Sequence, residues 1–67
     1  MKKFTDEELE AFVDLPLEDA EAKAAYNGLL VRIVSRNGKP KVVTSEFRTD
    51  RINFDLKGKI VTNAYIG

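Results

Sequence analysis

The feature that most constrains the fold of this chain is the long gap between its two clearest strand patterns. Residues 29–35, LLVRIVS, are almost all apolar and often β-branched, and residues 51–56 alternate apolar with polar side chains. Residues 36–50 lie between them, which is more than a hairpin needs but suits the crossover of a parallel pair. We therefore expect these strands to pair in parallel, with residues 42–48 projecting at one end of the sheet.

A short helix is predicted near the start of the chain. Thr5 is followed by acidic residues, with Glu8 three positions on, which is the pattern of a capping box. Leu9 and Phe12 then follow at helical spacing, so we expect this helix at residues 6–13.

The second predicted helix, residues 16–26, is rich in alanine and is favourable by propensity. Pro16 suits its first turn, and Gly28 suits a stop because glycine readily adopts the left-handed backbone angle. Ala20 and Ala24 lie on its apolar stripe, where small side chains would let the helix lie close on a sheet.

The strand after residues 51–56 is expected at residues 59–66, joined to it by a tight turn at Lys57-Gly58. Residues 36–39 predict another turn, and Pro40 argues against regular strand pairing directly after that turn. The aromatic residues expected in the core or at its edge are Phe4, Phe12, Tyr26 and Tyr65.

This order of elements predicts an α/β (α+β) fold with a single domain over residues 1–67. One main helix would pack on a small mixed sheet that carries a long extended loop. Residues 1–14 would form a helical extension before the main body, residues 15–67.

The composition argues against an enzyme. A chain of 67 residues has room for one small core, and this chain has no Cys and no His. Without these residues it can form no disulfide, no thiolate or histidine zinc site, and no catalytic triad built on His. We expect no cofactor and no metal.

The charges are unevenly spread although they sum to zero. Residues 1–28 carry three Lys against eight Asp or Glu, and residues 29–67 carry eight Lys or Arg against three acidic residues. One interpretation is an acidic helical half beside a basic sheet, whose fields largely cancel. The other is a nucleic-acid site in the basic half, although the interleaved aromatic residues of a single-strand binder are missing. Its candidate residues are Arg32, Arg36, Lys39 and Lys41.

The start of the chain, MKKFTDEELEAF, meets acidic residues before any apolar run, unlike a signal peptide. No stretch approaches the roughly 20 apolar residues of a membrane span. The sequence therefore predicts a cytoplasmic protein that does not enter a membrane, with removal of an earlier leader left open.

Residues 42–56, VVTSEFRTDRINFDL, run from the middle of the connection between the expected parallel strands into the second strand and contain neither Gly nor Pro. Ordinary turns use Gly, Pro, Asn or Asp to reach special backbone angles. The absence of Gly and Pro here indicates an extended segment, which Arg48 and Arg51 could hold from behind.

The pattern Val43-Thr44-x-Glu46-Phe47-Arg48-x-Asp50-Arg51-Ile52-x-Phe54 resembles the reactive-site segment of the potato inhibitor I family. These are the chymotrypsin-inhibitor and eglin-like serine protease inhibitors, which also have small bacterial relatives. The resemblance extends over residues 12–67, including the entry into the main helix and the ending Ile66-Gly67.

The resemblance implies a protease-binding loop with its scissile bond between Ser45 and Glu46. The loop residues are Val42, Val43, Thr44, Ser45, Glu46, Phe47 and Arg48. Val42 and Val43 would lie along the protease as an added strand. Arg51 would support the loop from below, and Gly67 could reach Arg51 or Asn53 from the adjacent strand.

Two positions depart from many members of the family. Asn53 stands where a second supporting arginine is common, which implies one charged support fewer. Ser45 is too small to fill a large apolar pocket, so an elastase-like or subtilisin-like target fits better than a chymotrypsin-like one.

The predicted function is therefore reversible, substrate-like inhibition of a serine protease by a monomeric bacterial or phage protein. An alternative is a non-inhibitory interaction module, in which the same scaffold presents residues 42–48 to an intracellular partner. Nucleic-acid binding by the basic half is the third hypothesis.

Overall fold

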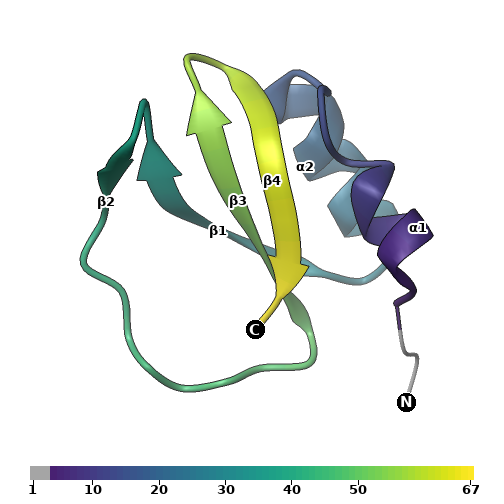
Figure 1. The fold of residues 1–67 in the computed structure, drawn as a ribbon. Coiled ribbons are helices and arrows are strands. Elements are labelled where there is room, and N and C mark those ends of the chain that lie inside the picture. Colours follow the sequence, from purple (N-terminus) through teal and green to yellow (C-terminus); the bar gives the residue numbers. More distant parts are fainter. Residues whose placement is uncertain (1–3) are drawn as a thin grey trace.

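The computed structural model describes residues 4–67. Its elements are α1 (Asp6–Glu10), α2 (Leu17–Tyr26), β1 (Leu30–Arg36), β2 (Lys39–Pro40), β3 (Arg51–Lys57) and β4 (Ile60–Ile66). The four strands form one mixed sheet in the order β2-β1-β3-β4, with the helices on one side of it (Figure 1). The predicted α+β single domain is thus confirmed.

The long gap in the strand pattern does correspond to a parallel pair. β1 and β3 run parallel, with Leu30 opposite Arg51 and Arg32 opposite Asn53. β4 then returns antiparallel to β3, with Asn53 opposite Tyr65. Asn53 therefore lies in the middle of the sheet, between a residue of β1 and a residue of β4.

The expectation that Pro40 argues against regular pairing after the turn is wrong. Pro40 and Lys39 form the two-residue strand β2, which pairs antiparallel with Ser35 and Arg36. Proline is tolerated there because β2 is an edge strand, where a missing N–H costs no ladder bond. The turn before it has positive φ at both central residues, Asn37 and Gly38, as a tight hairpin requires.

The core lies between the sheet and α2. One face of β3 contributes Ile52, Phe54 and Leu56, which are all buried, and α2 contributes Ala20 and Ala24, which are fully buried. The opposite face of the sheet, which we call the outer face, receives the alternating polar side chains of β3. These polar residues are Arg51, Asn53 and Asp55.

α1 is shorter than the predicted helix at residues 6–13. Its capping box is formed by Thr5 and Glu8, but the helix ends at Glu10. The backbone N–H of Phe12 bonds to the carbonyl three residues earlier, so the chain tightens into turns there. Asp14 follows with φ of 71°, a left-handed conformation that stops the helix.

Two of the four aromatic predictions are wrong. Phe12 is buried, with its ring centroid 5.7 Å from that of Phe54, and Phe4 packs at the edge of the core. Tyr26, however, is 92% exposed, since it follows Ala24 by two residues and so points away from the sheet. Tyr65 lies on the outer face of β4 and is exposed as well.

Within residues 4–67, neither helix has the length and apolar character needed to cross a membrane.

Candidate functional site

The connection from β2 to β3 is an exposed loop, residues 41–50. Figure 1 shows it curving past the end of the sheet at which the C-terminus lies. Every residue in it is exposed, including the predicted binding segment 42–48. Its apolar side chains Val42 and Phe47 are 105% and 72% exposed, and exposed apolar side chains grouped on one loop are typical of a contact surface.

Arg51, the first residue of β3, joins this loop to the end of β4. Its Nη2 donates to the carbonyl oxygen of Glu46 at 3.0 Å and to that of Gly67 at 2.8 Å. Its Nε also donates to the Gly67 oxygen, at 3.0 Å. The residue is 9% exposed, and charge-assisted hydrogen bonds in such sheltered places contribute about 1.5–3 kcal/mol each.

A second arginine reaches the loop from a different strand. Arg32 of β1 donates from Nη1 to the carbonyl oxygen of Thr44 at 3.2 Å and to the Thr44 hydroxyl at 3.3 Å. Its Nε donates to the Oδ1 of Asn53 at 2.7 Å. Asn53 is fully buried, and its amide nitrogen donates to the carbonyl oxygen of Tyr65 at 3.4 Å.

Position 53 itself thus carries no charge, as the sequence indicates, but Arg32 supplies a charged support to the loop beside it. Arg32 is also one of the candidate nucleic-acid contacts, but its guanidinium is engaged with Asn53 and Thr44. The signal that could have found it is the parallel pairing itself, which places Arg32 beside Asn53 in the register.

The side chains on either side of Ser45 are tied to each other. Thr44 Oγ1 donates to Glu46 Oε1 at 3.4 Å, and that carboxylate oxygen lies 3.6 Å from Arg51 Nη1. Side chains alternate along an extended chain, and the arginines hold Thr44 and Glu46 towards the sheet. Ser45, which lies between them, therefore points away from the sheet. Ser45 is exposed there, available to a partner.

The return of the loop to β3 is ordered by an exposed ion pair. Arg48 Nε and Nη2 donate to the two carboxylate oxygens of Asp50, both at 2.8 Å. The hydrogen bond from Arg48 lowers the pKa of Asp50, and the same bond raises the pKa of Arg48. The Arg48 backbone N–H also donates to the Gly67 carbonyl oxygen, at 3.3 Å. Such an exposed pair orders the local chain but contributes little to global stability.

Phe47 and Gly67 lie against each other where the loop meets the end of β4. A Cβ placed on Gly67 would be 3.7 and 3.8 Å from two atoms of the Phe47 ring, and 3.3 Å from Asn53 Nδ2. A side chain at residue 67 would thus meet the Phe47 ring at ordinary contact distance, and only Asn53 Nδ2 would be crowded, while Phe47 itself is 72% exposed.

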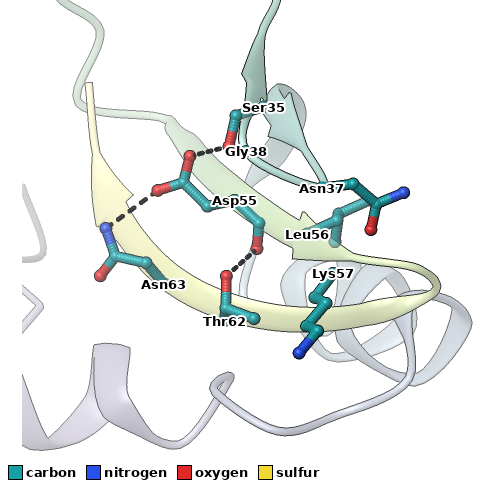
Figure 2. Close-up of a pocket in the computed structure, with 8 residues that line it drawn as sticks. All are labelled: Ser35, Asn37, Gly38, Asp55, Leu56, Lys57, Thr62 and Asn63. Carbon is teal, nitrogen blue, oxygen red and sulfur yellow. Dashed lines mark hydrogen bonds between the residues drawn. The ribbon is translucent and has the colours of Figure 1, made fainter.

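The other end of the outer face carries a hollow of about 580 Å³ around Asp55 (Figure 2). The Asp55 carboxylate accepts hydrogen bonds from the Ser35 hydroxyl and from Asn63 Nδ2, the latter at 3.1 Å. Thr62 Oγ1 donates to the Asp55 carbonyl oxygen at 3.1 Å. Asp55 therefore cross-links three strands, and this arrangement does not indicate a ligand.

Across residues 4–67, no three Asp, Glu, His or Cys side chains gather as metal ligands would. Comparison of the chain with protein-family models, with curated proteins and with solved structures gives no match.

Proposed function

We propose that this protein inhibits a serine protease by reversible, substrate-like binding of residues 42–48, as the potato inhibitor I family does. It would act as a monomer, without a cofactor and without enzymatic activity of its own. The observation that supports this most directly is the pair of arginines below the loop, which bind the carbonyl oxygens of Thr44 and Glu46. These carbonyls lie on the two sides of the proposed scissile bond, Ser45–Glu46.

A loop held in this way loses little conformational entropy when it enters a protease. Proteases bind their substrates extended, and ordering a free peptide costs free energy that an already ordered loop avoids. Val42 and Val43 are exposed at the start of the loop and could pair with the enzyme as an added strand. Preorganisation would therefore give tight binding.

The same supports would oppose hydrolysis. After cleavage, the new amine of Glu46 would stay beside the acyl-enzyme, because Arg51 holds the Glu46 carbonyl. Religation would then compete with attack by water, since a retained group has a high effective concentration. The chain would behave as an inhibitor although it is chemically a substrate.

The loop also indicates which protease it would fit. Ser45 suits a small or shallow primary pocket, and Val42 is fully exposed for an apolar subsite further along the groove. An elastase-like or a subtilisin-like enzyme has these properties, and we propose that class as the target.

The test is incubation of the wild type and of Arg51→Ala with subtilisin and with pancreatic elastase. Residual protease activity and the mass of the chain are followed over hours. The wild type should inhibit stoichiometrically, either intact or in equilibrium with a form cut once at Ser45–Glu46. Arg51→Ala should be hydrolysed about ten- to a hundredfold faster, which corresponds to 1.5–3 kcal/mol of lost loop support.

Arg36→Ala is the matched control, because Arg36 is an exposed arginine at the far end of β1. This variant should inhibit as well as the wild type. Rapid digestion of the wild type without any loss of protease activity would contradict the proposed function.

A second candidate is a non-inhibitory interaction module that acts in the cytoplasm. It is favoured by the exposed apolar side chains of Val42 and Phe47, which could serve any protein partner, and by the small Ser45. This candidate would be favoured by a partner that binds the wild type but neither Val42→Ala nor Phe47→Ala, provided that the wild type inhibits no protease.

A further inference from the structure

The two sides of the Ser45–Glu46 bond are held by different arginines from different strands. The Thr44 carbonyl oxygen accepts from Arg32 of β1, and the Glu46 carbonyl oxygen accepts from Arg51 of β3. The side chains of Thr44 and Glu46 also meet across Ser45, but only through an exposed hydrogen bond of 3.4 Å, which is long for two oxygens and therefore weak.

Arg32 depends on Asn53 for its direction. A guanidinium has donors at fixed angles, so a hydrogen bond from Nε to the Asn53 Oδ1 at 2.7 Å also fixes where Nη1 points. Asn53 is in turn oriented, because its Nδ2 donates to the Tyr65 carbonyl oxygen. The support thus runs from β4 through Asn53 and Arg32 to Thr44.

An asparagine suits this buried position better than a charged residue would. Asn53 is fully buried, and an amide with both ends hydrogen-bonded can be buried at far lower cost than a lone charge. The charge is carried instead by Arg32, which is partly exposed. Arg32 lies on β1, the neighbour of the strand β2 from which the loop begins. Asn53 therefore places a cation under Thr44 without being one.

We propose that Arg32 and Asn53 are positioning residues that hold the Thr44 side of the loop independently of Arg51, which holds the Glu46 side. Because β1 and β3 are paired directly, a cut between Ser45 and Glu46 leaves each new end bound to its own arginine on adjacent strands. The consequence for inhibition rests on the function proposed above, but the two-sided support itself does not.

The experiment measures backbone ¹⁵N order parameters of the free protein, with no protease present. Three arginine variants are compared with the wild type: Arg32→Met, Arg51→Met and Arg36→Met. Methionine keeps much of the aliphatic stem, so loss of the guanidinium is tested with little loss of packing. Thermal unfolding of each variant shows whether it is folded at the temperature of measurement.

Arg32→Met should lower the order parameters of residues 43–45 from about 0.85 to below about 0.6, while residues 46–48 stay rigid. Arg51→Met should do the reverse, and Arg36→Met should change neither segment. Arg32→Lys should restore residues 43–45 in part, since an ammonium cannot bind Asn53 and Thr44 in the same planar fork. Asn53→Ala should reproduce the loss seen in Arg32→Met.

Uniform loosening of residues 43–48 in both Arg32→Met and Arg51→Met would overturn the inference, as would unchanged order in Arg32→Met. If the two variants lower the order parameters of different segments and the wild type inhibits no protease, the two-sided support holds and the proposed function is contradicted. If the wild type inhibits a protease but both variants loosen all of residues 43–48, the proposed function holds and the two-sided support is contradicted. The failure of one can therefore be told from the failure of the other.

Discussion

At one end of the outer face, Arg32 and Arg51 donate to carbonyl oxygens of the loop, whereas at the other end Asp55 accepts from side chains of neighbouring strands. Strands that already share a ladder of hydrogen bonds gain a further cross-link from Asp55. The loop has no such ladder of backbone hydrogen bonds, so its conformation depends on the hydrogen bonds from the two arginines. The same face of one sheet therefore cross-links strands at one end and orders the exposed loop, residues 41–50, at the other.

Asn53→Leu should have the largest effect, because Asn53 lies in the centre of the arginine end and is fully buried. Arg32 Nε would lose its acceptor and the Tyr65 carbonyl its donor, which should cost about 2–3 kcal/mol of stability. Urea unfolding measures this cost. The matched change Asn63→Leu at the Asp55 end, where the side chain is exposed, should cost below about 1 kcal/mol. Equal costs would remove the distinction between the two ends.

Asp55→Ala should have an intermediate effect that is confined to stability. The Ser35 hydroxyl and the Asn63 amide lose their acceptor but can rebind water at this half-buried place, so we expect a loss of about 1–2 kcal/mol. The rate of cleavage within residues 42–48 under limiting protease should not change. A several-fold rise in that rate, in protein that is still folded, would mean that the two ends are coupled.

The pair between Arg48 and Asp50 should have the smallest effect, because both residues are exposed. The hydrogen bond from Arg48 lowers the pKa of Asp50 below its ordinary value of 3.8. The stabilising contribution is therefore present above that ordinary value and is lost as the pH falls through the lowered pKa. Thermal midpoints of the wild type and of Asp50→Asn should differ slightly at about pH 7 and converge once the pH has fallen below the lowered pKa of Asp50. A difference that persists at the lower pH would show that the carboxylate charge is not its cause.

The fold was predictable to the extent that it follows from local patterns. The alternation of Ile52, Phe54 and Leu56 and the small residues of α2 indicated the core, and the length of the gap indicated the parallel pair. Tyr26 was misplaced because an aromatic residue at the end of a helix can face either way, and two residues along a helix turn the side chain by more than half a circle.

Of the two arginines that support the loop, only Arg51 of β3 could be predicted from the sequence. Arg51 and the loop lie close together along the chain, so their proximity could be expected. Arg32 lies 21 positions before Asn53, and their contact depends on the register of the parallel pair. A shift of one residue would have placed Val31 or Ile33 there instead and moved Arg32 to the other face.

The parallel pairing of β1 with β3 also means that the loop covalently connects two halves of one sheet, β2 with β1 and β3 with β4. A chain cut at Ser45–Glu46 would be two fragments, each with a part of the hydrophobic core, held together as a complex of two molecules. Its unfolding temperature would depend on protein concentration, unlike that of an intact chain that unfolds as a monomer. Dilution would then shift the equilibrium towards the separated fragments, and concentration would shift it back towards the two-fragment complex.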